Sequence, residues 1–252
     1  MTKNNDPRSI DKQIVSVSEL IYPEEKKGKF IPEVKSRLRS KIIKVPEASY
    51  KASGIKILGV RIKTLLFTTD VALVKNHNAQ SVIAVYPFTP QLSIMQAIIN
   101  TASVPVFTGV GGGLTTGIRA VNIALQAELL GAFGVVVNAP MANDVIKDIA
   151  NAVDIPVIAT IVSYDDDFKG KIHAGASILN VSAGKNTAEL VSRIRKSIGE
   201  EFPIIATGGN SDELISKTIE AGANSITYTP PTSAEMFHEI MIKYREEMGD
   251  YK

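Results

Sequence analysis

The sequence predicts an α/β protein whose parallel strands close into a (β/α)8 TIM barrel, preceded by a basic N-terminal extension. From about residue 55, short runs of β-branched residues alternate with amphipathic stretches, which is typical of parallel strands joined by crossover helices. Eight such runs follow one another, landmark residues repeat along them, and the chain has 252 residues, a usual length for this barrel. An open, doubly wound sheet built from the same local units is the alternative.

The eight predicted strands are separated by stretches long enough for one helix and two loops, so that each unit can form a right-handed crossover. They are Thr64–Thr69, Ser81–Tyr86, Val104–Thr108, Gly134–Asn138, Pro156–Thr160, Ser177–Ser182, Pro203–Thr207 and Ser225–Thr229. A proline opens three of these strands without giving up a needed ladder bond, and a glycine before three others supplies the left-handed turn from helix to sheet. These landmarks are Pro105, Pro156 and Pro203, and Gly131, Gly175 and Gly222.

The first quarter of the chain differs from the rest in charge. Residues 1–60 hold 13 Lys and Arg against 7 Asp and Glu, whereas residues 61–252 hold 15 against 19. We therefore expect an extension over residues 1–60, which plugs the barrel or contacts a partner subunit of a homo-oligomer, and a barrel over residues 61–252. The extension lacks the interleaved aromatic and basic residues typical of nucleic-acid contacts, so such a partner is disfavoured.

Composition excludes several kinds of site. The chain has no cysteine, which rules out disulfides, thiolate catalysis and cysteine-built metal sites. Its three histidines lie too far apart for a local metal-binding pattern, so no metal is predicted. Prolines and glycines interrupt the longest uncharged stretch, the first twenty residues lack the apolar core of a secretory signal, and a cytoplasmic location without membrane contact is expected.

In a TIM barrel the ligand site lies at the C-terminal ends of the strands, so each predicted strand nominates particular residues. These ends are polar but hold few charges, which suits hydrogen bonding to a polar or phosphorylated small molecule better than metal binding. Asn138 and Asn180, expected on the inside ends of two strands, are candidates to orient a carbonyl or hydroxyl group. The other nominated residues are Thr68, Thr69, Asp70, Tyr86, Thr108, Thr160, Ser163, Tyr164, Ser182, Lys185, Thr207, Gly208, Gly209, Asn210 and Thr229.

The turns after the last two predicted strands form a candidate phosphate site. The first turn holds two glycines, which let the backbone approach an anion, and both turns lead into helices whose positive N-terminal ends face the same place. The residues concerned are Gly208, Gly209, Asn210, Thr229, Thr232 and Ser233. On these residues, the repeat from about 64 to 235 resembles the broad phosphate-binding (β/α)8 superfamily, which includes tryptophan and thiamine pathway enzymes, keto-acid aldolases and flavin-mononucleotide oxidoreductases. A tight strand-to-helix turn without a ligand is the alternative.

A second glycine-rich turn follows the third predicted strand. It does not match the dinucleotide-binding pattern G-x-G-x-x-G, because Leu114 holds the final position, and it lacks the Lys–Ser/Thr ending of a P-loop. Gly111, Gly112 and Gly113 are therefore expected to give a ligand access to the backbone or to hinge over it. A close-packed turn without a ligand is the alternative.

The sixth predicted strand bears on lysine Schiff-base chemistry. The run from Asn180 to Lys185 resembles the Lys-Thr-Ser-Thr-Gly pattern of deoxyribose-phosphate aldolases, but Asn180 stands where that family has its nucleophilic lysine. This departure removes the nucleophile. Lys185 follows on a loop, where it can meet an anionic substrate group or simply be solvated.

Asp70, directly after the first predicted strand, is the candidate acid/base. A carboxylate at a barrel mouth can act as a general base if burial raises its pKa. It can equally cap a helix that begins at Val71.

These residues predict an enzyme of the lyase or isomerase class that acts on a phosphorylated small metabolite, by proton transfer or by cleavage of a C–C or C–O bond. The predicted catalytic set is Asp70, Lys185, Asn138 and Asn180, and no cofactor is predicted. One alternative is a non-catalytic sensor that resembles the glycerol-phosphate-responsive antiterminators, in which the barrel binds a phosphate ester. The other is a flavin-mononucleotide (FMN) oxidoreductase, whose flavin phosphate would use the same two turns.

Overall fold

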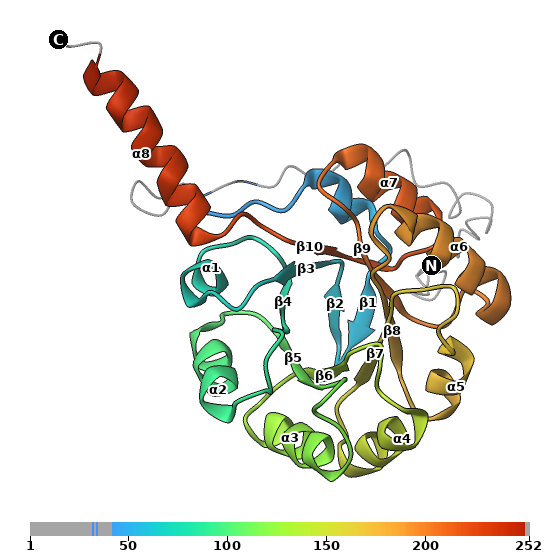
Figure 1. Cartoon of the computed structure of the whole chain (residues 1–252). Coiled ribbons are helices and arrows are strands. Elements are labelled where there is room, and N and C mark those ends of the chain that lie inside the picture. The colour runs from blue at the N-terminus through green and yellow to red at the C-terminus, as the bar shows by residue number, and fades with distance from the viewer. Residues whose placement is uncertain (1–31, 33, 35–41, 250–252) are drawn as a thin grey trace, which may run out of the picture. The chain divides into compact units, whose positions relative to one another are not determined.

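A computed structural model describes residues 32, 34 and 42–249 of the chain. Eight parallel strands form a closed barrel in the order β10-β3-β4-β5-β6-β7-β8-β9, surrounded by helices (Figure 1). The predicted TIM barrel is confirmed, and the alternative of an open sheet is wrong. The strands are β1 (Ile55–Ile57), β2 (Val60–Ile62), β3 (Thr64–Phe67), β4 (Ser81–Ala84), β5 (Val106–Gly111), β6 (Gly134–Val137), β7 (Val157–Ile161), β8 (Ile178–Val181), β9 (Ile204–Thr207) and β10 (Ser225–Tyr228). The helices are η2 (Glu47–Lys51), α1 (Val71–Lys75), α2 (Leu92–Thr101), α3 (Ile118–Leu129), α4 (Asn143–Ala152), α5 (Phe168–His173), η3 (Gly184–Asn186), α6 (Thr187–Ile198), α7 (Asp212–Glu220) and α8 (Ser233–Gly249).

The repeated prolines and glycines mark where strands begin and helices end. Each proline lies just before a strand, and its carbonyl oxygen accepts a bond from the neighbouring strand, as that of Pro105 does from the Val82 amide at 2.9 Å. The missing proline N–H therefore costs no ladder bond. Gly131 follows α3 with a φ of +92°, and the next amide, that of Ala132, donates back to Ala127. This left-handed cap ends the helix and turns the chain toward β6.

A hairpin of β1 and β2 closes the N-terminal end of the barrel. The two strands pair antiparallel directly before β3. Ile55, Ile57 and Ile62 of the hairpin belong to the same buried cluster as the inward-facing Leu65 and Phe107 of the barrel. Figure 1 shows the hairpin within the ring of strands. Packed apolar side chains therefore fill the barrel from its N-terminal end, and the C-terminal end is left for a ligand.

Residues 43–52, which include the short helix η2, pack on the outer side of β3 and β10 together with Leu73 and Val74 of α1. Ile43 and Val45 are buried in one cluster with Leu66 of β3, and Tyr228 of β10 packs against that cluster. These residues belong to the compact unit Lys41–Lys252. Of the predicted extension, residues 1–31, 33 and 35–41 lie outside the described part of the chain, and the division of the chain at residue 60 stays a prediction.

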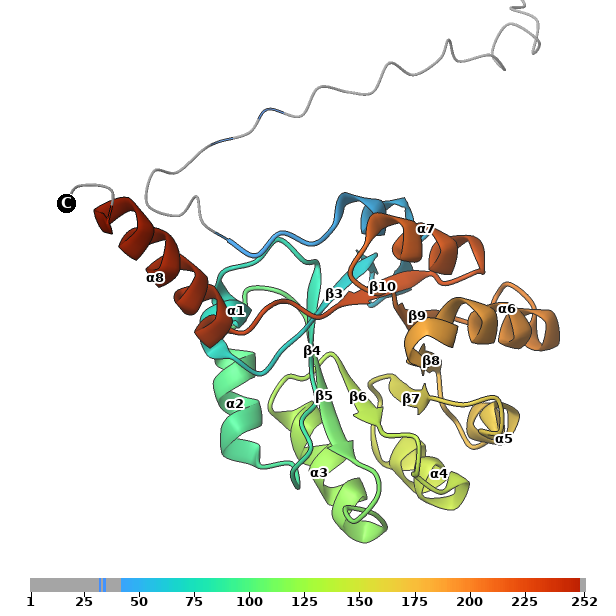
Figure 2. The ribbon, with the colours of Figure 1, turned by 45° about the horizontal axis from the view of Figure 1, so that its top comes forward.

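The last helix, α8, extends away from the barrel (Figure 2). Its side chains Phe237, Ile240, Tyr244 and Met248 are 49 to 65% exposed. None of the helices in residues 42–249 is long and apolar enough to cross a membrane.

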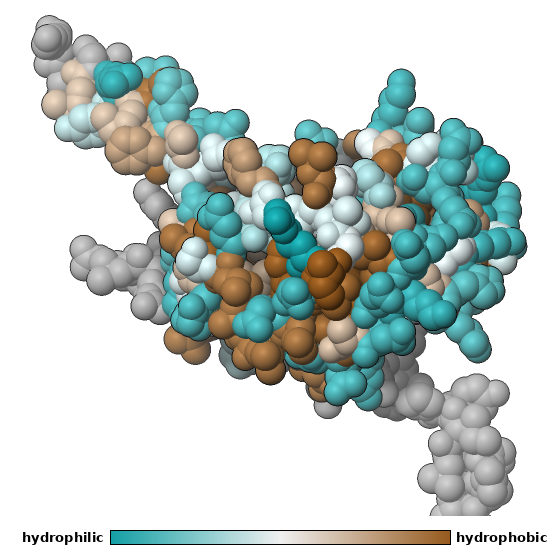
Figure 3. All heavy atoms as spheres, turned by 60° about the horizontal axis from the view of Figure 1, so that its bottom comes forward, coloured by the Kyte–Doolittle hydropathy of each residue, from teal (hydrophilic) through white to brown (hydrophobic). Residues whose placement is uncertain are grey.

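A second exposed apolar surface lies on α2 and α3. The side of the molecule at the bottom of Figure 1, brought forward in Figure 3, carries much apolar surface. Its residues include Leu92, Ile94, Ile118, Leu125 and Leu129.

Candidate functional site

Uncharged polar side chains line the inside of five neighbouring strands at the C-terminal mouth of the barrel. Their direction follows from the alternation of side chains along a strand: Ile178 of β8 belongs to the interior cluster, so Asn180, two residues further, faces the same side. The same alternation places one or two polar residues inside each strand from β6 to β10. We call this set the polar strip; it consists of Asn138, Thr160, Asn180, Ser182, Thr207 and Thr227.

The side chains of the polar strip use only part of their hydrogen-bonding capacity among themselves. The Thr207 hydroxyl donates to Ser182 at 3.1 Å, and the Asn180 amide nitrogen makes a long contact of 3.4 Å with the Thr160 hydroxyl. The Asn180 carbonyl oxygen and the Thr227 hydroxyl are buried without a hydrogen-bond partner among the described residues. A buried polar group left unpaired costs about 1–3 kcal/mol. A ligand or water that bonds to these two atoms would recover that cost.

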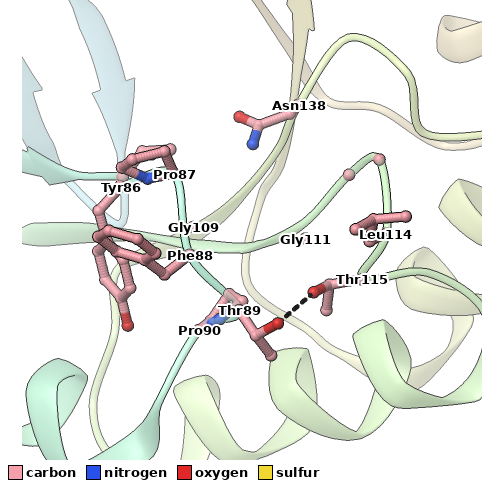
Figure 4. Close-up of a pocket in the computed structure, with 13 residues that line it drawn as sticks. Tyr86, Pro87, Phe88, Thr89, Pro90, Gly109, Gly111, Leu114, Thr115 and Asn138 are labelled. Carbon is pink, nitrogen blue, oxygen red and sulfur yellow. Dashed lines mark hydrogen bonds between the residues drawn. The ribbon is translucent and has the colours of Figure 1, made fainter.

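The other half of the mouth is apolar and opens into a pocket of about 450 Å³ (Figure 4). On β3, β4 and β5 the inward positions at the C-terminal ends are occupied by Phe67, Val85 and Gly109. These positions correspond to those of the polar strip on the other five strands. The pocket lies between the loop after β4 and the loop after β5, and Asn138 also lines it. Asn138 therefore stands where the pocket and the polar strip meet. The full lining is Val85, Tyr86, Pro87, Phe88, Thr89, Pro90, Gly109, Gly111, Gly112, Gly113, Leu114, Thr115 and Asn138.

Close packing explains two of the three glycines in the loop after β5. A Cβ on Gly111 would collide with the carbonyl oxygen of Thr115, and one on Gly112 would lie 2.5 Å from the Cβ of Asn138. Gly113 has open space around it but a φ of +59°. The close-packed turn and the ligand loop are both compatible with this geometry, because Gly111 and Gly112 are closely packed and also line the pocket.

Asp70 caps α1, as one of its two expected roles requires. Its carboxylate accepts bonds from the amides of Ala72 at 2.8 Å and Leu73 at 3.4 Å, and from the hydroxyl of Ser233 at the start of α8. The hydrogen bond from Ser233, followed by those from the two amides, lowers the pKa of the Asp70 carboxyl. A raised pKa, which would help an acid/base role at neutral pH, is not found. Its part in proton transfer stays a prediction.

The turns of the predicted phosphate site carry negative charge. Gly208 is packed against Ile226 and Ile215, and Gly209 has a φ of +79°, so a tight turn accounts for both glycines. Asp212 and Glu213 occupy the first turn of α7, whose Leu214 amide is already capped by the Ser211 hydroxyl. These carboxylates repel an anion at this helix end. Phosphate binding by Gly208, Gly209 and Asn210 stays a prediction.

The start of α8 is also capped internally. Glu235 accepts bonds from the amide and hydroxyl of Thr232, at 2.7 and 2.9 Å, and these bonds lower the pKa of the Glu235 carboxyl. Ser233 is engaged with Asp70. Thr229 is exposed directly after β10. Among the described residues, the side chain of Thr229 makes no hydrogen bond, so it remains free to bind a ligand.

The remaining predicted residues fall in different places. Asn138 and Asn180 come together in the polar strip with Thr160, Ser182 and Thr207. Thr108 faces outward, because Phe107 beside it points into the barrel. Lys185 lies exposed on η3, at the rim beyond β8. Among residues 42–249, no cluster of histidine and carboxylate side chains could hold a metal ion.

Lys171 is a buried residue at this site that was not singled out from the sequence. It is 4% exposed, and its ammonium donates to the carbonyl oxygens of Ala139 at 2.9 Å and Met141 at 2.8 Å. Burial lowers the pKa of Lys171, against the opposing effect of Asp166 and Asp167. These bonds hold the loop that follows Asn138. The sequence gives no local signal for this contact, because the lysine and its acceptors are about 30 residues apart.

No protein-family model matches the chain, and no curated protein is similar to it. Solved structures share its fold. A phosphonopyruvate hydrolase has a TM-score of 0.59 and 14% identity, over 83% of this chain and 86% of that chain. A phosphoenolpyruvate phosphomutase from Streptomyces platensis subsp. rosaceus has a TM-score of 0.58 and 12% identity, over 81% and 86%. A dihydrodipicolinate synthase from Bacillus anthracis has a TM-score of 0.53 and 14% identity, over 74% and 77%. At such identities the likeness shows the TIM-barrel fold alone.

Proposed function

We propose that the chain is an enzyme that binds a small phosphorylated metabolite at the barrel mouth and acts on it by proton transfer or by cleavage of a C–C or C–O bond. The observation that carries the proposal is the polar strip, in which buried oxygen atoms of Asn180 and Thr227 have no hydrogen-bond partner among the described residues. Buried polar groups of this kind are usually paired, so two unpaired oxygen atoms on the inner face at the C-terminal end of the barrel support a place for ligand atoms.

Each predicted residue has a role in this proposal. Asn138 and Asn180 orient a carbonyl or hydroxyl group of the substrate, and Lys185 at the rim meets an anionic group. Asp70, on the loop after β3 at the barrel mouth, is the candidate base. The names of the similar structures, a phosphonopyruvate hydrolase and a phosphoenolpyruvate phosphomutase, are in keeping with a small phosphorus-containing substrate.

The proposal does not include a Schiff base. Asn180 occupies the inward position on β8 that a nucleophilic lysine would take in the aldolases that this strand resembles. Lys185, the next lysine along the chain, is exposed on η3.

Ligand-induced stabilisation tests the proposed function. Phosphoenolpyruvate, glycerol 3-phosphate and methyl phosphate are added separately, and thermal unfolding is followed. A ligand at one hundred times its Kd stabilises the fold by about 2.7 kcal/mol. Asn180→Leu, which removes the unpaired oxygen and keeps the side-chain volume, is expected to abolish the shift. Asn122→Leu, on the exposed face of α3, is the matched control. If no phosphorus compound stabilises the wild type, the proposed substrate class is wrong.

A non-catalytic sensor is the second candidate, and two observations favour it. The polar strip contains no charged residue, and the carboxylate of Asp70 is engaged as a helix cap. A sensor would be stabilised by a phosphate ester without converting it. Mass spectrometry of the compound after incubation with the protein separates the two candidates, because an enzyme changes the compound and a sensor returns it intact.

FMN is a third possibility for the same mouth. Its phosphate would have to lie at the turns after β9 and β10, where Asp212, Glu213 and Glu235 place negative charge, so these residues fit the flavin phosphate poorly. A purified protein that is yellow, or that takes up added flavin, would support this candidate, and a colourless protein that takes up none would contradict it.

We also propose that the chain forms a homodimer through α8. The apolar residues Phe237, Ile240, Tyr244 and Met248 recur at helical spacing and are exposed, and a helix gains most of its stability from burying such a stripe. The charged residues of α8 lie beside this stripe and include both signs in its second half, which carries Lys243, Arg245, Glu246 and Glu247. Antiparallel packing of two α8 helices would bury both apolar stripes in a two-fold interface.

A further inference from the structure

The 450 Å³ pocket beside the polar strip differs from it in chemistry. The strip is uniformly polar, whereas the pocket walls are made by the aromatic rings of Tyr86 and Phe88, by Pro87 and Pro90, and by the glycine backbone (Figure 4). None of its lining side chains is charged. Its volume lies within the range of small-molecule sites, which is about 300–1,000 Å³. No cation lines the pocket to balance the charge of a phosphate group, so the pocket suits a different part of a ligand.

Two apolar side chains at the rim of the pocket are largely exposed to solvent. Phe88, on the loop after β4, is 73% exposed, and Leu114, at the tip of the loop after β5, is fully exposed. Figure 4 shows them on opposite sides of the pocket opening. Large apolar side chains gain stability when they leave water. A flat apolar group placed between them would bury both.

The pocket is preformed on one side and adjustable on the other. The Tyr86 hydroxyl accepts a bond from the Gln91 amide at 2.8 Å, which fixes its ring at the start of α2. The Thr115 hydroxyl donates to Thr89 at 3.2 Å and ties the two loops together. Gly113 and Leu114 form the tip of a turn that backbone bonds between Gly112 and Thr115 close, so the adjustment toward the pocket is made by the exposed Leu114 side chain.

We infer that the pocket holds a flat, uncharged apolar group of the substrate, clamped between Phe88 and Leu114, while the polar end of the same molecule lies on the polar strip beyond Asn138. The inference rests on the proposed function for the polar end and adds the class of substrate: a phosphorylated compound that carries an aromatic or similarly flat apolar group. Asn138 touches both halves and is placed to bond at the junction of the molecule.

Three probes separate the two ends of such a substrate. Phenyl phosphate carries both groups, methyl phosphate carries the anion with almost no apolar part, and phenol carries the ring alone. Their affinities are measured by calorimetric titration, with saturation-transfer NMR for weak binding. We expect phenyl phosphate to bind at least about tenfold more tightly than methyl phosphate, as one well-buried ring allows.

The variants Phe88→Ala and Leu114→Ala are expected to remove this tenfold preference and to leave the affinity for methyl phosphate unchanged. Both residues are exposed, so their replacement leaves the folded core intact. Leu129→Ala, which removes a 71% exposed leucine from α3 outside the pocket, is the matched control and is expected to change nothing.

The outcomes distinguish this inference from the proposed function. Equal affinity for phenyl and methyl phosphate, or a preference that survives both variants, overturns the apolar clamp and leaves the proposed function standing. Binding of phenol that depends on Phe88 and Leu114, with no binding of methyl phosphate, supports the clamp and contradicts the phosphorylated substrate. If neither ring compound binds, the clamp is wrong.

Discussion

The carboxylate of Asp70 caps helix α1 and also lies at the barrel mouth, where it bonds to Ser233. Its charged form accepts bonds from two amides at the start of α1 and from Ser233 of α8, so it joins the first and last parts of the barrel ring. A charge that accepts hydrogen bonds is favoured over its protonated form, which is why the pKa of Asp70 is lowered. The same bonds make Asp70 a weaker base than a buried, unpaired carboxylate would be.

The lowered pKa of Asp70 predicts a pH-dependent contribution to stability. A carboxyl group whose pKa is lower in the folded state stabilises the fold above its unfolded pKa, and this contribution is lost as the pH falls through the folded pKa. We expect Asp70→Asn to lower the free energy of unfolding by about 0.5–1 kcal/mol at pH 7. The difference from wild type should vanish in acid, below the folded pKa. Urea unfolding from pH 7 to pH 2 measures it.

The control for this experiment is Asp148→Asn, on the exposed face of α4. It should show no comparable loss at pH 7. A difference between Asp70→Asn and wild type that stays constant down to pH 2 would mean that the charge of Asp70 is not what stabilises the fold.

At the scale of elements, the loop after β5 decides the shape of the pocket. Gly112 lies so close to Asn138, at the end of β6, that a side chain has no room between them. Its φ of +133° is also a conformation that other residues rarely adopt. Gly113, one residue further, has a positive φ but free space. Two adjacent glycines are thus required for different reasons.

This contrast predicts unequal effects of two alanine substitutions. Gly112→Ala should destabilise the protein by about 2–4 kcal/mol, because backbone strain and a collision with Asn138 add together. Gly113→Ala should cost about 1–2 kcal/mol, since the left-handed backbone alone opposes it. Chemical denaturation gives both values. Equal losses would show that the loop relaxes away from Asn138 and that the close packing is not rigid.

The eight barrel strands could be predicted from the sequence, whereas the hairpin of β1 and β2 and the apolar inner side of the pocket could not. Proline and glycine act on their own backbone, so landmarks such as Pro105 and Gly131 fix nearby strand starts and helix ends without knowledge of the rest. Asn138 and Asn180 were found for the same reason, as polar residues at strand ends. Phe67 and Val85 were missed, because parallel strands buried on both faces do not show which residues point inward.

At the scale of the whole molecule, α8 is a helix that buries little of its apolar surface within a single chain. Most of its side chains are exposed, including a stripe of large apolar ones, while residues 43–52 pack on the outer side of β3 and β10 together with α1. A second copy of the chain supplies the missing surface in our proposal. The dimer would leave the barrel mouths of both copies built from their own residues.

The proposed dimer has a direct test. Light scattering during size-exclusion chromatography should give twice the 27.1 kDa of one chain for the wild type. The double variant Phe237→Glu with Tyr244→Glu should elute at the mass of one chain, because charges on the apolar stripe cannot be buried without partners. Lys147→Glu, on the exposed face of α4, makes a charge change away from the stripe and should leave dimers. A wild type that elutes as a single chain contradicts the proposal.

The hairpin of β1 and β2 blocks the N-terminal end of the barrel with isoleucine side chains. Substrate and products must therefore pass through the same C-terminal mouth. A substrate broken in two would then release its fragments in sequence, the shallower one ahead of the deeper one. Product-inhibition kinetics should reveal this order of release, because one product should inhibit competitively with respect to the substrate and the other should not.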